Sequence, residues 1–164
     1  MVFREGDPVM HWTYGLGRIM HLEERDLFGS TALYYAVEVG ELTVWVPVDG
    51  KLESRLRPPM SGDEFARLLP ILSSAGEPLP DDRNERRLRL QKLFKDGLAE
   101  SLCYIIRDLS AYQSVKALND NDQLLLKQAR TALLGEWGFA LSLTPAQAER
   151  EMHQLLSRNS ESEE

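Results

Sequence analysis

A change in hydrophobic periodicity at Pro58-Pro59 constrains the fold more than any other feature of this chain. Before it, from residue 6 to about residue 57, apolar and polar side chains alternate at period two between glycine-containing turns, a pattern typical of short strands with one face on a core. From Ser61 onward, apolar residues recur at spacings of three and four, as in helices. Because proline suits neither a central strand nor a helix interior, the boundary is expected near residue 58.

The first part predicts five strands. They are expected at Asp7–His11, Arg18–Glu23, Ala32–Val39, Leu42–Val48 and Leu52–Leu56. Five strands in about 55 residues are too few for a sandwich but sufficient for an SH3-like or Tudor-like β-barrel. The barrel core is expected to contain Val9, Ile19, Tyr35, Val37 and Val44.

The second part predicts a compact all-α domain. Its helices are expected at Asp63–Ser73, at Arg83–Lys95, from Leu98 to Leu109, from a cap at Asn119–Asp122 to Trp137, and after Thr144. Thr144 and Gln147 form a capping-box pattern with Pro145 at the first helical position. The fold class is therefore α+β in two domains, residues 1–57 and 58–164, with a frayed polar tail at residues 159–164.

Charge is distributed unevenly along the chain. The net charge of −7 argues against nucleic acid as a partner, since binding a duplex requires clustered cations. From Arg83 to Lys95, however, six basic residues stand against one acid, a local charge of +5. Two interpretations remain open: a phosphate-binding patch, or a solvated helix face paired with acids such as Asp81, Asp82 and Glu85.

Catalytic and metal-binding patterns are absent from the sequence. The three histidines (His11, His21 and His153) and the single Cys103 show neither zinc-ligand spacing nor a nucleophile pattern. We therefore expect no enzyme activity, no cofactor, no metal and no small-molecule substrate. Cys103 lies in an apolar run and is expected to be a reduced core residue. With no apolar segment of signal or membrane-spanning length, we expect a cytoplasmic location.

The N-terminal segment from Phe3 to Ile19 resembles the opening of the CarD/CdnL/transcription-repair-coupling-factor interaction domain. It keeps the pattern F-x-x-G-D-x-V and the paired glycines Gly15 and Gly17. Tyr35 and the strand Leu42–Pro47 are also similar to that family. The helical part keeps further CarD/CdnL-like segments at Leu90–Leu93, Arg107–Leu109 and Lys127–Glu136.

The resemblance implies a transcription regulator whose barrel binds the β subunit of RNA polymerase. Its helical domain would contact promoter DNA at the upstream edge of the melted region and change the stability of the open complex. The implied polymerase-binding residues are Arg25, Thr43, Val44 and Trp45, with Trp45 standing where the family commonly has an arginine.

The implied DNA-binding residues lie in the basic run and would contact the backbone without reading sequence. They are Arg83, Arg86, Arg87, Arg89 and Lys92. Helical spacing places Arg86 nearest the inward stripe of Leu90, Leu93 and Phe94, so Arg83 and Arg87 are expected to matter most.

One departure from the family leaves an alternative open. The family's DNA-wedging tryptophan has no aromatic counterpart between Gly76 and Leu93. Trp137 is expected in the core instead. The missing wedge and the acidic net charge favour an adaptor that binds polymerase, or another protein, without contacting DNA.

Overall fold

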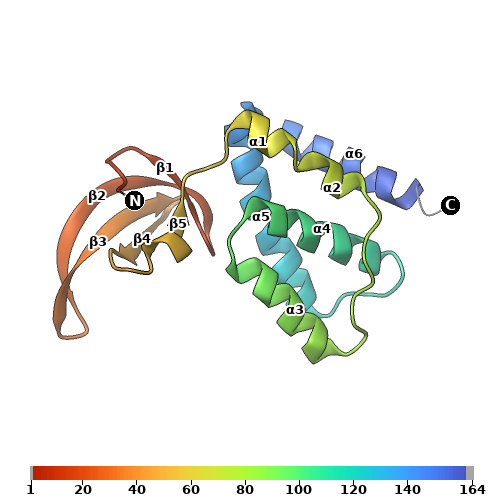
Figure 1. Cartoon of the computed structure of the whole chain (residues 1–164), viewed down its shortest axis with the longest axis horizontal. Coiled ribbons are helices and arrows are strands. Elements are labelled where there is room, and N and C mark those ends of the chain that lie inside the picture. The colour runs from red at the N-terminus through yellow and green to blue at the C-terminus, as the bar shows by residue number, and fades with distance from the viewer. Residues whose placement is uncertain (1, 162–164) are drawn as a thin grey trace.

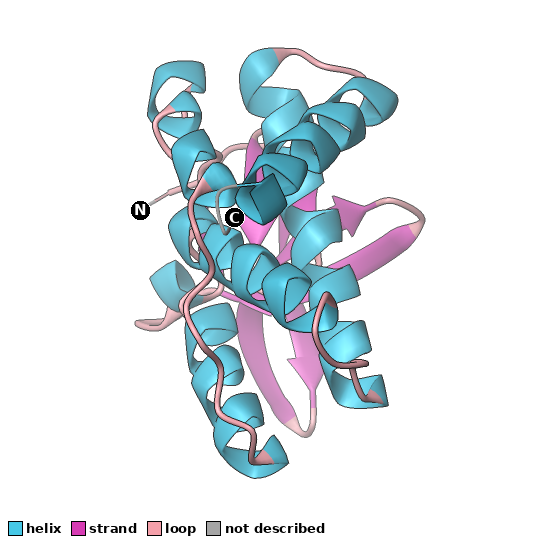
Figure 2. Ribbon diagram, turned by 90° about the vertical axis from the view of Figure 1, so that its right-hand side faces the viewer, coloured by secondary structure: helices cyan, strands magenta, loops and turns pink. Residues whose placement is uncertain are grey.

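A computed structural model describes residues 2–161 of the chain. These residues form a five-stranded antiparallel sheet followed by six α-helices (Figure 1). The strands are β1 (Pro8–His11), β2 (Gly15–Leu27), β3 (Ser30–Val39), β4 (Leu42–Pro47) and β5 (Leu56–Arg57). Their order in the sheet is β4-β3-β2-β1-β5, so β4 and β5 form its two edges. Figure 2 shows the helices gathered on one side of the sheet.

The predicted sheet core is confirmed. Val9, Ile19, Tyr35 and Val37 are buried, and Val44 packs against them while partly exposed. The closed barrel is not confirmed, because among the described residues no ladder joins edge strands β4 and β5. The strand expected at Leu52–Leu56 is wrong in its first half: Leu52–Ser54 is a short 3-10 helix, and β5 follows it.

Strands β2 and β3 extend further than the sequence predicts. β1 pairs with β2 only up to Arg18, and β4 pairs with β3 only from Tyr34 onward. Residues 24–33 are therefore a two-stranded extension with no third strand beside it, which we call the β2–β3 arm. In Figure 1 the arm projects away from the helices at the lower left. Its length escaped prediction because the charged run at residues 23–26 breaks the alternation.

The helices begin close to the predicted positions. They are α1 (Gly62–Ala66), α2 (Leu69–Ser73), α3 (Arg83–Lys95), α4 (Ala99–Gln113), α5 (Asp120–Leu141) and α6 (Pro145–Glu161). The single helix expected at Asp63–Ser73 is instead two helices. Pro70 lies in the first turn of α2, where its missing N–H is tolerated, whereas inside one continuous helix it would break a hydrogen bond.

Both predicted caps are confirmed. The Asn119 side chain accepts a hydrogen bond from the Asp122 N–H at the start of α5. Thr144 and Gln147 exchange reciprocal side-chain to backbone hydrogen bonds of 2.9 and 3.2 Å before α6. α5 continues past the predicted end at Trp137. α6 is assigned up to Glu161, and residues 162–164 lie outside the described part, so the frayed tail at residues 159–164 stays a prediction.

A second core fills the helical part and is separate from the sheet core. Trp137 is fully buried there beside Phe65, and Cys103 is buried in α4, so both core predictions are confirmed. The change from strands to helices between Arg57 and Gly62 matches the predicted boundary. That residues 1–57 and 58–164 act as independent domains stays a prediction.

The sheet and the helices are held together by close contacts. Gly15 has φ +84°, and a Cβ there would lie 3.1 Å from Ala132 Cα of α5. Arg57, at the end of β5, donates two hydrogen bonds of 2.6 Å to the Glu136 carboxylate and one of 2.8 Å to the Gly97 carbonyl. Glu136 is fully buried and also accepts the Met60 N–H at 2.9 Å. We call Arg57 and Glu136 the junction pair.

Candidate functional site

An aromatic and cationic cluster lies on the outer face of the sheet. Strand alternation directs Val44 and Val46 toward the core and Trp45 to the opposite face, as predicted. The Arg25 guanidinium carbon lies 3.9 Å from the centre of the Trp45 ring, and the His21 ring lies 6.0 Å from it, edge to face. We call Trp45, Arg25 and His21 the outer-face cluster.

Strand register explains why these side chains meet. Ala36 of β3 pairs with His21 on one side and with Trp45 on the other. Ala36 is fully buried although it belongs to the outer face, so the larger side chains cover it. Arg25 takes part in no ion pair among the described residues, and its charge rests against the aromatic ring, a favourable cation–π arrangement.

The sequence did not indicate His21 as part of this cluster. A β-bulge between Ile19 and His21 shifts the register, so Ile19 faces the core while His21, two residues later, faces outward. His21 Nε2 also lies 2.8 Å from the Glu23 carboxylate. Regular alternation would have placed His21 on the core face, and no residue in the segment marks the bulge.

The implied polymerase-binding residues of β4 differ in what they expose. Thr43 is solvent-exposed, whereas the Val44 side chain packs against the sheet core. Because Val44 is half-buried, only part of its side chain is free for a partner. β4 is an edge strand, paired with β3 on one side only, so part of its backbone is free for another strand.

Four of the five basic residues expected to contact DNA are exposed on α3. They are Arg83, Arg87, Arg89 and Lys92. Arg86 is the exception and is removed from this group: its side chain is 4% exposed, and its Nε donates to Asp122 at 2.9 Å. The reason is helical spacing, since Arg86 lies one turn before the buried Leu90.

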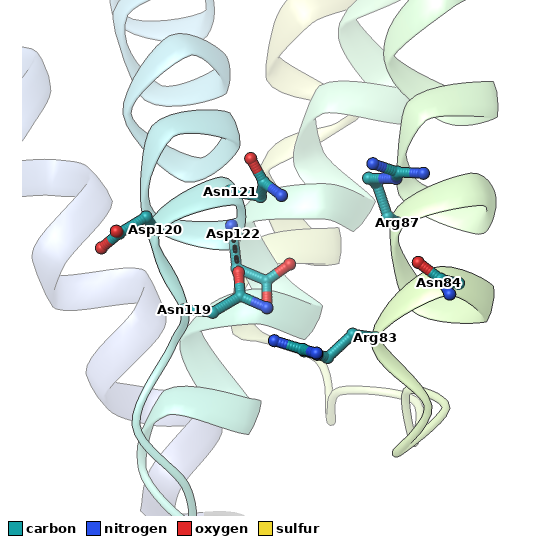
Figure 3. A pocket seen from close by; sticks show the side chains of 7 residues that line it. All are labelled: Arg83, Asn84, Arg87, Asn119, Asp120, Asn121 and Asp122. Carbon is teal, nitrogen blue, oxygen red and sulfur yellow. Dashed lines mark hydrogen bonds between the residues drawn. The ribbon is translucent and has the colours of Figure 1, made fainter.

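Arg83 and Arg87 line a pocket of about 390 Å³ between the starts of α3 and α5. Asn84 and residues 119–122 form the rest of its wall. Figure 3 shows both arginine side chains extending from α3, with Asp120 directed away from them. The α5 N-terminus adds partial positive charge here. Neither arginine belongs to an ion pair within residues 2–161.

Two of the three acids that could have neutralised these arginines are engaged elsewhere. Asp82 caps α3 by accepting the N–H groups of Asn84 and Glu85, each at 2.9 Å. Asp81 pairs with Lys116 at 3.0 Å. Among the exposed basic residues of α3, Arg89 has an acidic neighbour, Glu77, at 3.4 Å. Within residues 2–161, Arg83, Arg87 and Lys92 therefore take part in no ion pair, and the choice between the two interpretations of the basic run stays a prediction.

The titratable groups outside these surfaces have structural roles. His11 Nδ1 accepts the backbone N–H groups of Thr13 and Tyr14, and burial lowers the His11 pKa below its usual value. Burial raises the pKa of the Cys103 thiol to about 12. No group of three or more His, Cys, Asp or Glu side chains within residues 2–161 is placed to hold a metal ion.

No helix in the described part of the chain is both long enough and apolar enough to cross a membrane.

The chain is similar to known proteins in sequence. The family model of the CarD-like/TRCF RID domain matches residues 3–59, which cover the whole sheet, the outer-face cluster and Arg57. A Bacillus subtilis (strain 168) protein with the name "Putative transcription factor YdeB" is 24% identical over 149 residues, spanning 89% of this chain and 97% of the relative. Residues 3–59 therefore match the CarD-like/TRCF RID domain, and the chain as a whole is similar to a protein with the name of a transcription factor.

Proposed function

We propose that this protein regulates transcription by binding the β subunit of RNA polymerase through the outer-face cluster and so changes the stability of the open promoter complex. The observation that carries the proposal is the half-buried Arg25–Trp45 stack on the outer face of the sheet, within the region that matches the CarD-like/TRCF RID domain. The relative named as a transcription factor supports the same role. Residues 1–57 would then be the polymerase-binding domain of a cytoplasmic protein.

The cluster has the composition of an interface hot spot. Tryptophan and arginine are the residues most enriched where truncation costs most binding energy. Trp45 already rests on Ala36 and against Arg25, so little side-chain freedom is left to lose on binding. The open edge of β4 supplies backbone groups beside the cluster, including those of Thr43 and Val44, for pairing with a strand of the partner.

Replacing Trp45 with alanine tests this docking site. Hot-spot truncation typically costs about 1–4 kcal/mol, so we expect Trp45→Ala to weaken binding to the isolated β lobe about tenfold or more. Phe139→Ala is the matched control, because Phe139 is an exposed aromatic on α5, far along the chain from the sheet. Circular dichroism checks that both variants fold. Unchanged affinity of Trp45→Ala would contradict the proposal.

We further propose that residues 58–164 contact promoter DNA through the basic surface of α3, defined by Arg83, Arg87, Arg89 and Lys92. Contacts of this kind go to phosphates and carry no sequence information, so binding should fall steeply with salt. The supporting observation is that Arg83 and Arg87 share a pocket with the α5 N-terminus and form no ion pair within residues 2–161. The missing aromatic wedge suggests little discrimination between promoters.

The Arg83→Glu/Arg87→Glu double variant tests the DNA contact. We expect it to abolish the contribution of upstream promoter DNA to binding of the polymerase–promoter complex, and to flatten the salt dependence, while affinity for polymerase alone is unchanged. Arg150→Glu/Arg158→Glu, at two exposed positions on α6, is the charge-matched control.

A protein–protein adaptor that does not touch DNA is the second candidate function. The net charge of −7 favours it, as do the acids Asp82 and Asp120 near the basic surface. If the double variant behaves like the wild type across a range of salt concentrations, the adaptor function is the better explanation.

A further inference from the structure

The β2–β3 arm extends beyond the rest of the sheet and adds little to the sheet core. Its four cross-strand pairs, from Glu24↔Leu33 to Leu27↔Ser30, lie beyond the ladders of β1 and β4, and its base is held where the Leu33 carbonyl accepts the Val48 N–H at 3.0 Å. Residues 28–33 are all exposed, including Leu33. An isolated two-stranded ribbon buries little and is only marginally stable in water. An arm that projects from the sheet without a core of its own is typical of a segment that contacts a partner.

The tip of the arm carries an aromatic residue whose side chain is not packed against the rest of the fold. Phe28 and Gly29 form a two-residue hairpin loop closed by the Leu27↔Ser30 pair, with φ values of +56° and +80°. Such a turn favours asparagine or glycine at its first position, and a bulky side chain is strained there. Phe28 is nevertheless present, and its side chain is 103% exposed.

The arm continues directly from the outer-face cluster. Arg25 belongs to both: it pairs with Ala32 in the arm and stacks on Trp45. Phe28 lies three residues further along, roughly 10 Å at the rise of a strand. A partner that covers Trp45 and Arg25 can thus reach the tip without bending the arm. By strand alternation, the exposed acids Glu24 and Asp26 lie on the opposite face of the arm from Arg25, whose charge rests against the tryptophan ring.

We infer that the β2–β3 arm is a second docking element, in which Phe28 enters an apolar pocket with a positively charged rim on RNA polymerase. The inference rests on the proposed function and adds to it the chemistry of a second contact. Phe28 supplies the buried aromatic surface, and Glu24 and Asp26 supply charge complementary to the rim. The left-handed backbone at Phe28 presents the side chain at the extreme end of the arm.

Two substitutions at Phe28 separate binding from folding. Phe28→Gly removes the side chain and relieves the left-handed strain, and Phe28→Asn keeps a side chain that tolerates this conformation. We expect both to lower affinity for purified bacterial core RNA polymerase at least about fivefold, while thermal stability is equal to or above that of the wild type. Val115→Ala is the control, because Val115 is an exposed apolar residue after α4. The Glu24→Lys/Asp26→Lys variant should also weaken binding.

The outcomes separate this inference from the proposed function. If Trp45→Ala weakens binding and both Phe28 variants bind as the wild type does, the arm is not a docking element and the proposed function stands. If the wild-type protein does not bind polymerase, both fail. A benzoylphenylalanine at position 28 should crosslink to a polymerase subunit. Crosslinking to a second copy of this chain, with dimers in sedimentation velocity that Phe28→Gly abolishes, would assign the arm to self-association and overturn the inference.

Discussion

Replacing Glu136 with alanine should destabilise the protein more than any exposed charge substitution. Glu136 is fully buried and accepts three hydrogen bonds, two from Arg57 at 2.6 Å and one from the Met60 N–H at 2.9 Å. Removing one partner of a buried ion pair leaves the other charge uncompensated and costs about 3–5 kcal/mol. Because the Arg57 side chain is 18% exposed and can regain some water, we expect the lower end, about 3 kcal/mol.

Urea unfolding followed by circular dichroism measures this loss. With a slope of about 1–3 kcal/mol per molar urea for a protein of this class, the midpoint should fall by about 1–3 M. Glu149→Ala is the control: Glu149 is 66% exposed and lies 3.9 Å from Arg130, so its removal should leave the midpoint nearly unchanged. A loss below about 1 kcal/mol for Glu136→Ala would refute the claim that the junction pair contributes to stability.

A double-mutant cycle separates the ion pair from the packing around it. Arg57→Met combined with Glu136→Leu removes both charges and keeps most of the side-chain volume. Replacement of a buried ion pair by apolar residues is often close to neutral, so the double variant should be more stable than Glu136→Ala. If the losses in the free energy of unfolding caused by Arg57→Met and by Glu136→Leu add up to the loss of the double variant, the two residues do not interact and the junction pair does not stabilise the protein.

Three further predictions concern groups outside the proposed interfaces. Cys103, with its pKa raised to about 12 by burial, should react with a thiol reagent at pH 8 only after denaturant is added. Burial lowers the His11 pKa below 6.5. The contribution of neutral His11 to the free energy of unfolding should therefore be complete above pH 6.5 and be lost as the pH falls through the lowered pKa. His11→Asn, which can still accept the Thr13 and Tyr14 N–H groups, should remove this part of the pH dependence of urea unfolding. Asn119→Ala should cost about 1 kcal/mol in the same assay, because it removes the α5 cap.

Features set by local sequence were predictable. The change of period at Pro58-Pro59 located the boundary between strands and helices, and Asn119 and Thr144 marked two helix starts. Strand alternation placed Trp45 on the outer face, and helical spacing placed Arg86 near the core. Each of these depends on neighbours within a few positions, where spacing alone determines which side a residue faces.

Features that depend on distant segments were not predictable. The partner of Arg86 is 36 positions away at Asp122, and that of Arg57 is 79 positions away at Glu136. Closure of the sheet into a barrel depends on whether its two edge strands pair with each other. The alternation of apolar and polar residues within a strand does not indicate this. The bulge before His21 reverses the face of His21 and of the β2 residues that follow it, including Arg25, without any glycine or proline to mark it.

The junction pair gives a physical reason why an acidic protein could still use a small basic surface. Free in solution, a net charge of −7 opposes approach to DNA, and the few exposed cations of α3 are too few to overcome it. In the proposed function, docking of the sheet on polymerase would present α3 to the promoter at a high effective concentration, provided that the sheet and helices keep one orientation. The Arg57–Glu136 contact and the packing of Gly15 on α5 hold that orientation. Loosening the junction with Glu136→Ala should therefore reduce the DNA contribution in the polymerase–promoter complex while leaving the affinity for the β lobe unchanged.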